Sequence, residues 1–115
     1  MGLLSRLTKG RMGRRGSSAD DGLAHLRAWV AAHEGVEGFV EPRTTVTETT
    51  LLLVDKDGAW TRRRVASPAA ARKFARSLAM PVYDVQLVGY PQRMRDHDAR
   101  QRVLRKRARQ ADLEG

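Results

Sequence analysis

Apolar and polar residues repeat along the chain with two periods, and these periods predict an order of helices and strands. The first helical pattern has an apolar face at three- and four-residue spacing, formed by Leu23, Leu26 and Val30. Ser18 followed three residues later by Asp21 resembles a capping box, so we expect the helix to begin there. Gly35 is a natural position for its end. The pattern therefore predicts an amphipathic helix of about 14 residues.

The next part of the chain has the pattern of β-strands. Residues 36–40 form a short apolar patch, and residues 44–54 are rich in β-branched side chains. Residues 55–58 have the composition of a turn, and residues 59–66 are suited to pair with the preceding strand. We therefore expect a short strand followed by a β-hairpin.

Side chains of the second hairpin strand should alternate between the two faces of the sheet. One face receives Trp60, Arg62 and Arg64, and the other receives Thr61, Arg63 and Val65. An aromatic ring beside two arginines can stack a nucleobase and bind its phosphates, with Tyr83 and Tyr90 as further stacking surfaces. The alternative is that Trp60 packs in the core or beneath arginine side chains.

The second half of the chain begins with a helix signal, since Ser67 precedes Pro68, a residue favoured at the first helical position. The expected buried face of this helix comprises Ala71, Phe74, Ala75 and Leu78. Pro81 ends it, and residues 82–90 alternate as another strand. Residues 92–111 permit a helix but lack a clean apolar stripe. That helix either docks only in part, or its last two turns form a solvated tail.

The predicted order is helix, short strand, hairpin, helix, strand and helix, which is the order of a small α+β domain. We expect a mostly antiparallel sheet that contains a β-hairpin and is flanked by about three helices, packed on one face. The last strand could also lie parallel to its neighbour, because the helix before it permits a crossover connection.

The composition fits one small domain of 115 residues without cysteine. The absence of cysteine excludes a disulfide framework, a thiolate zinc site, an iron–sulfur cluster and a cysteine nucleophile. No apolar run approaches the roughly 18 residues that a membrane span needs. We therefore expect a cytoplasmic protein that does not span a membrane.

The formal net charge of +9 lies at the two ends of the chain. Residues 1–18 carry +5 and residues 92–115 carry +4, whereas residues 19–91 sum to zero. Residues 1–18 mix Gly, Ser and Arg with few apolar anchors, which predicts a flexible basic arm. We expect a compact α+β domain over residues 19–95 and an Arg-rich helix or tail over residues 96–115.

A strongly basic balance favours polyanionic partners, namely RNA, DNA or the ribosome. In a helix, Arg102, Arg105 and Arg109 recur at three- and four-residue spacing. The candidate nucleic-acid-binding residues are Arg11, Arg14, Arg15, Arg62, Arg64, Arg93, Arg100, Arg102, Arg105, Lys106, Arg107 and Arg109. The alternative for the C-terminal group is a solvated surface that keeps the protein soluble.

Few residues suggest chemistry. A cluster of His25, His33 and His97 could be imagined as a metal or acid–base site, but their spacing matches no known ligand pattern, so we predict no metal site. Asp84 lies within an apolar segment, where a carboxylate is either catalytic or a solvent-facing group paired with an arginine. Because no second carboxylate accompanies it, we predict no catalytic residue and no cofactor.

Three segments carry a resemblance to a known family: EPRTTVTETTLLLV, which begins at Glu41, DGAWTRRRV in the hairpin, and PVYDVQLVGYPQRMRDHDAR, which ends at Arg100. They resemble a family of short actinomycete-type proteins of unassigned function, over about half of the chain. The resemblance implies one compact unit over residues 36–95. Members of this family are sometimes labelled oxidoreductases, although this sequence has neither a GxGxxG fingerprint nor a redox cysteine pair.

The preferred interpretation is a small accessory protein whose basic flanks bind nucleic acid or the ribosome without sequence preference. One alternative is an interaction module for an acidic protein partner, and another is an enzyme of the oxidoreductase label. A fourth is attachment to a membrane surface through Leu3, Leu4 and Leu7 together with basic groups.

Overall fold

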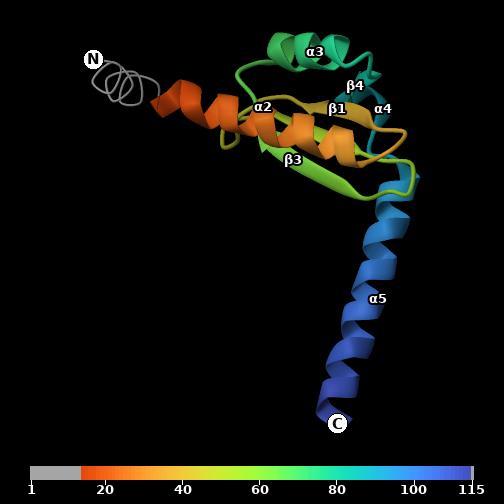
Figure 1. Ribbon diagram of the computed structural model, residues 1–115. Coiled ribbons are helices and arrows are strands. Elements are labelled where there is room, and N and C mark those ends of the chain that lie inside the picture. The colour runs from red at the N-terminus through yellow and green to blue at the C-terminus, as the bar shows by residue number, and fades with distance from the viewer. Residues whose placement is uncertain (1–13, 115) are drawn as a thin grey trace.

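The computed structural model describes residues 14–114, which form a four-stranded sheet, helices packed against it and one long helix that leaves it (Figure 1). The strands are β1 (Glu37–Glu41), β2 (Thr50–Val54), β3 (Trp60–Arg64) and β4 (Val82–Asp84), in the spatial order β3-β2-β1-β4. β1 pairs antiparallel with β2 and β2 with β3, whereas β4 is parallel to β1. The predicted α+β class, with a mostly antiparallel sheet and a hairpin, is confirmed.

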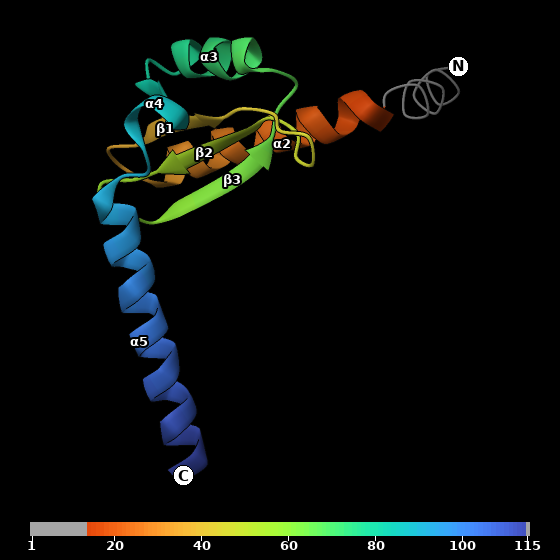
Figure 2. The same ribbon diagram turned by 180° about the vertical axis from the view of Figure 1, so that it is seen from behind.

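Two helices, α2 (Arg14–Ala32) and α3 (Pro68–Ser77), pack on the same face of the sheet. α2 crosses in front of the strands in Figure 1, and the strands lie in front of α2 in Figure 2. The larger core lies between these layers, where Leu26 of α2 and Phe74 of α3 meet Val40, Leu51 and Leu53 of the sheet. These five side chains are at most 4 % exposed, so this face supplies most of the apolar burial.

The predicted apolar face of the first helix is confirmed, since Leu23, Leu26 and Val30 all pack in this core. Its predicted start is wrong, because α2 begins at Arg14 and Ser18 therefore lies within the helix. Once the docked turns of a helix are formed, each further residue adds one backbone hydrogen bond, and arginine is a good helix former.

α3 begins where it is predicted to begin, but it ends at Ser77, before Pro81. The Ser67 hydroxyl accepts a hydrogen bond from the backbone N–H of Ala70 at 3.0 Å, and Pro68 occupies the first turn. Its buried residues are Ala71, Phe74 and Ala75, and Leu78 packs partly against the same core.

The hairpin also forms as predicted, but its first strand is shorter. The Asp55 carboxylate shapes the turn by accepting hydrogen bonds from the backbone N–H groups of Asp57 and Ala59. Residues 44–49, predicted as strand, are a loop instead. Their β-branched composition is outweighed by the Thr44 hydroxyl, which accepts hydrogen bonds from the N–H groups of Val46 and Thr47 and turns the backbone.

The predicted strand over residues 82–90 is wrong beyond Asp84. The Asp84 carboxylate accepts a hydrogen bond from the backbone N–H of Gln86 at 2.8 Å and caps the short helix α4 (Val85–Val88). Gly89 then adopts a positive φ of 74°, which stops the helix. The helix leaves Leu87 84 % exposed, away from any sheet face.

The other face of the sheet carries a second, smaller core of Phe39, Leu52, Val54 and Met94. No helix from among the described residues lies flat across this face. Met94 belongs to the first turn of α5 (Gln92–Glu114), the long helix that then departs from the domain (Figure 2). Polar side chains cover the rest of this small core, and they include several of the predicted site residues.

Candidate nucleic-acid interface

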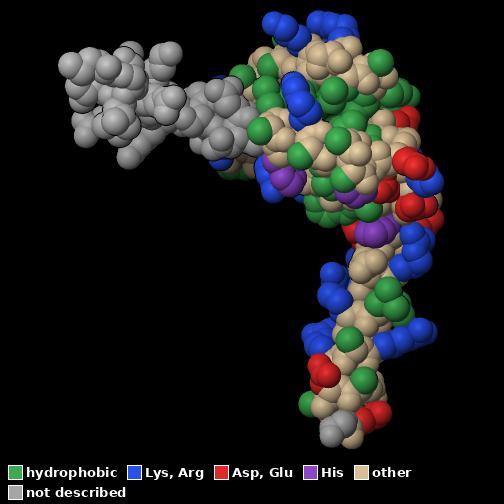
Figure 3. Space-filling model, in the orientation of Figure 1, with side chains coloured by type: hydrophobic (Ala, Val, Ile, Leu, Met, Phe, Trp, Pro, Cys, Tyr) green, Lys and Arg blue, Asp and Glu red, His purple; other side chains and the backbone are tan. Residues whose placement is uncertain are grey.

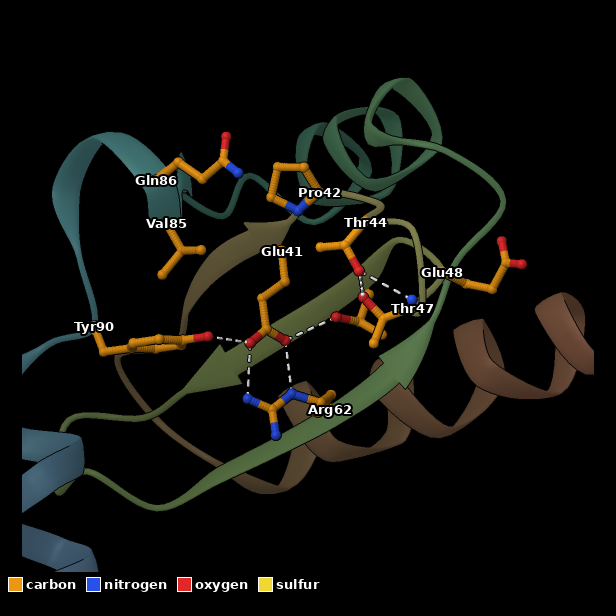
Figure 4. A pocket seen from close by; sticks show the side chains of 10 residues that line it. Glu41, Pro42, Thr44, Thr47, Glu48, Arg62, Val85, Gln86 and Tyr90 are labelled. Carbon is orange, nitrogen blue, oxygen red and sulfur yellow. Dashed lines mark hydrogen bonds and ion pairs between the residues drawn. The ribbon is translucent and has the colours of Figure 1, made fainter.

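Arg62, predicted to bind phosphate, is held by Glu41 on the face of the sheet that lacks a covering helix. Its Nε and Nη2 atoms donate to the two carboxylate oxygens of Glu41 at 2.6 and 2.8 Å. Thr50 donates to the same carboxylate at 2.8 Å, and the Tyr90 hydroxyl donates to it at 2.5 Å (Figure 4). Glu41 is thus the common acceptor for three side chains from β2, β3 and the segment before α5.

These contacts keep Glu41 ionised. Burial by itself raises the pKa of its carboxyl, but the hydrogen bonds from Arg62, Tyr90 and Thr50 outweigh burial and hold that pKa below its ordinary value. The hydrogen bond to Glu41 is also the main cause of a raised pKa at Arg62 and at the Tyr90 hydroxyl. Because the charge of Arg62 is already neutralised by Glu41, a phosphate would have to compete with a two-point ion pair to bind it.

Arg93 and Arg100, two further predicted residues, anchor the base of α5. Arg93 donates from Nη2 to Glu37 at 2.6 Å and from Nε to the Asp55 carbonyl at 2.8 Å. Arg100 donates to the carbonyl of Asp57 at 3.2 Å. Both side chains therefore attach α5 to the hairpin turn.

A glycine lets the hairpin turn and α5 approach each other this closely. Gly58 has a φ of +92°, and a Cβ atom at that position would collide with the Arg93 carbonyl and with the side chain of His97. The absence of a side chain at Gly58 thus permits the close docking of α5 on the turn.

Beyond this base, α5 projects into solvent. Every residue from Arg102 to Glu114 is exposed, a length of about 20 Å at 1.5 Å per residue. This projection carries Arg102, Arg105, Lys106, Arg107 and Arg109, and Figure 3 shows Lys and Arg side chains along the helix below the domain. None of these five forms an ion pair with another of the side chains that the structure describes, those of residues 22–114.

The basic residues of α5 divide into two sides of the helix. At 100° per residue, one arc of about 100° contains Arg95, Arg102, Arg105, Lys106 and Arg109. Arg93, Arg100 and Arg107 lie on the other side. Two members of that second group are the anchoring arginines, so the first arc is the larger group of available charges.

The remaining predicted residues lie elsewhere. Arg64 is exposed at the end of β3, on the same sheet face as Arg62. Arg14 and Arg15 form the first turn of α2, far along the chain from α5. Arg11 and the predicted membrane-surface leucines, Leu3, Leu4 and Leu7, fall outside the described residues.

The candidate residues for catalysis or metal binding do not come together. His25 is hydrogen-bonded to Thr61, and His33 stacks on Trp29 with ring centroids 3.7 Å apart. Asp84 is engaged as the cap of α4, as described above. Among the side chains of residues 22–114, no group of three or more His, Asp or Glu is placed to hold a metal ion.

One feature of the interface was not predicted: a corner between β3 and α5 that contains two tryptophans. A cavity of about 420 Å³ lies there, lined by Trp29, Trp60, His97, Gln101, Arg102 and Arg105. The sequence leaves Trp60 either as a base-stacking surface or as a ring packed beneath arginine side chains. The structure places the Arg62 guanidinium over the ring and also brings Trp60 beside the basic arc of α5. Trp29 was missed, and its sequence neighbourhood in an amphipathic helix gives no signal beyond packing.

Comparisons with protein-family models, with curated proteins and with solved structures found no match to the chain. Within the described part of the chain, no helix combines the length and the apolar character that a membrane crossing requires. The function must therefore be inferred from the side chains themselves.

Proposed function

We propose that this protein is a small nucleic-acid-binding or ribosome-associated accessory protein that holds phosphates with the projecting half of α5. The observation that carries the proposal is the exposed segment from Arg102 to Glu114, whose five basic side chains form no ion pair with any described side chain of residues 22–114. This segment adds no residue to either hydrophobic core, and the last core residue along the chain is Met94.

The basic side chains on this segment repel one another when no ligand is bound. Arg102 and Lys106 are four residues apart, as are Arg105 and Arg109, and like charges at this spacing destabilise a helix by about 0.2–0.5 kcal/mol per pair. A polyanion removes this repulsion and releases its condensed counterions, and both effects favour binding. The helix and its phosphate ligand therefore stabilise each other.

The proposed binding is independent of sequence. Arginine and lysine contacts to phosphate fix the position of a protein on nucleic acid but carry no direct information on base sequence. The proposal leaves out Arg62, Arg93 and Arg100, because these three are committed to Glu41, Glu37 and the Asp57 carbonyl. It centres on Arg102, Arg105, Lys106, Arg107 and Arg109 instead.

Salt dependence tests this proposal. Affinity of the full chain for a fluorescein-labelled 24-nucleotide single strand would be measured by anisotropy at several salt concentrations. With five phosphates neutralised, the plot of log affinity against log salt should have a slope of about −3.5 for the single strand. For a DNA duplex the slope should be about −4.5. A slope near zero, or no binding at low salt, would overturn it.

A second candidate function, docking to an acidic protein, is favoured by a different observation. Val103 and Leu104 are 48 % and 54 % exposed on the same projecting segment, where an apolar partner surface could cover them. Apolar contacts persist in high salt whereas phosphate contacts do not. Val103 and Leu104 would both be replaced by Gln. An unchanged affinity for nucleic acid would show that phosphate binding does not use these two side chains, which leaves them available to a protein partner.

A further inference from the structure

The corner between β3 and α5 is a built recess next to the proposed phosphate-binding helix. Figures 1 and 2 both show α5 leaving the domain at the end of the hairpin where β3 begins. The cavity of about 420 Å³ in this corner falls within the range of small-ligand sites. Its walls come from α2, β3 and α5, so its shape depends on how α5 docks against the turn at Gly58.

Trp60 is the aromatic surface of this recess, and its ring is held in place before any ligand arrives. The indole Nε1 donates to the Asp98 carboxylate of α5 at 2.8 Å. The guanidinium of Arg62 covers one side of the ring, 5.2 Å from its centroid, and Arg62 is itself fixed by Glu41. Trp60 as a whole residue nevertheless remains 36 % exposed, so a ligand can stack on its ring without the cost of ordering it.

Trp29 forms a second wall and is fixed in a similar way. His33 stacks on Trp29 at an interplanar angle of 16°, and Trp29 also packs against the larger core. Both tryptophans of the chain therefore line one recess.

The polar residues of the recess suit a nucleotide. Arg102 and Arg105 lie at its α5 side and belong to the basic arc proposed to hold phosphates. The Gln101 amide and the Asp98 carboxylate offer a donor and acceptors to the edge of a base. An aromatic platform beside basic groups is the arrangement by which proteins hold unpaired bases, since every base has a face that stacks.

We infer that this corner binds one unpaired nucleobase on Trp60 while Arg102 and Arg105 hold the adjoining phosphates, so that the ligand is a nucleic acid with a single-stranded segment. This inference rests on the proposed function, because it adds a base contact to the same phosphate-binding helix. A base within a duplex is stacked on its neighbours and cannot enter the recess.

Intrinsic fluorescence tests the inference on the unaltered chain, because both fluorophores line the corner. Titration with a dT 12-mer should quench tryptophan emission, whereas a 12-base-pair duplex bound at the same salt concentration should not. In a Trp29→Phe chain the quenching should persist, which assigns it to Trp60.

Affinity ratios provide the second readout. Trp60→Leu should lower the ratio of single-strand to duplex affinity about 10-fold, the loss expected when one stacked base is released. Tyr83→Leu removes an exposed aromatic ring at the opposite edge of the sheet and should leave the ratio unchanged.

The outcomes separate the two proposals. Binding of both ligands without quenching, and with an unchanged ratio in Trp60→Leu, would overturn the base site and leave phosphate binding intact. No binding of either ligand would overturn the proposed function together with the base site.

Discussion

Arg62 and Glu41 form a two-point ion pair across strands β3 and β1, on the face of the sheet that carries only the smaller core. The Glu41 side chain is 15 % exposed, and in the β2–β3 register Arg62 lies opposite Leu52, a fully buried residue of that core. The Arg62–Glu41 pair, joined by Tyr90 and Thr50, thus covers part of this sheet face. We therefore expect the pair to stabilise the fold.

Removal of the Arg62 charge should destabilise the fold. Arg62→Met keeps an unbranched side chain beside Leu52 but leaves the half-buried Glu41 carboxylate without its main partner. We expect the free energy of unfolding in urea to fall by about 1–3 kcal/mol. Arg64→Met, two residues away on the same strand and face, is the matched control and should change it by less than about 0.5 kcal/mol. Equal losses of unfolding free energy in the two variants would show that the Arg62–Glu41 ion pair is not the source of the lost stability.

The same pair predicts a pH dependence with a definite sign. The pKa of Glu41 is lower in the folded protein than its ordinary value of 4.5, so the unfolded chain binds the proton more tightly. The stability from this group is therefore complete above about pH 4.5 and is lost as the pH falls through the folded pKa. The difference in unfolding free energy between the unaltered chain and Glu41→Gln should shrink from pH 6 to pH 3. A difference that grows on acidification would contradict the assigned direction.

Gly58 should tolerate alanine much less well than Gly89 does. Both glycines have a positive φ, +92° and +74°, so alanine meets backbone strain of about 1–3 kcal/mol at either position. Nothing lies within 4 Å of a Cβ at Gly89, whereas at Gly58 it would collide with Arg93. Urea unfolding of Gly58→Ala should therefore show a further loss of about 1–3 kcal/mol. Similar losses at both positions would mean that the turn and α5 are not tightly docked.

Local signals explain which parts of the fold could be predicted from the sequence. The cap and first turn of α3 depend on adjacent residues, Ser67 and Pro68, and β1 and the hairpin depend on short apolar runs and one turn. The segment 82–90 misled the prediction because its alternation suits a strand. Two local features produce a helix instead: the Asp84 carboxylate accepts a hydrogen bond from the backbone N–H of Gln86, and Gly89 adopts a positive φ.

The candidate site divides in the same way. The basic spacing of α5 is a local property, and the prediction included all five projecting basic residues for that reason. The engagement of Arg62 and Arg93 could not be predicted, because their partners, Glu41 and Glu37, are 21 and 56 residues away in the chain. The meeting of Trp29 with α5 likewise depends on how α5 docks against the turn at Gly58.

Two matched triple substitutions test the central claim, that the projecting half of α5 holds phosphate. Arg102, Arg105 and Arg109 would be replaced by Gln in one variant. In the other, the exposed Arg72, Lys73 and Arg76 of α3 would be replaced by Gln, which removes the same net charge from a different part of the domain. Affinity for a labelled single strand would be measured for both at several salt concentrations.

The α5 variant should lose most of its affinity, and the slope of log affinity against log salt should become shallower by about 2, while the α3 variant should keep a slope close to that of the unaltered chain. Equal losses in the two variants would contradict the account, because they would mean that net charge alone, and not the projecting helix, attracts the polyanion.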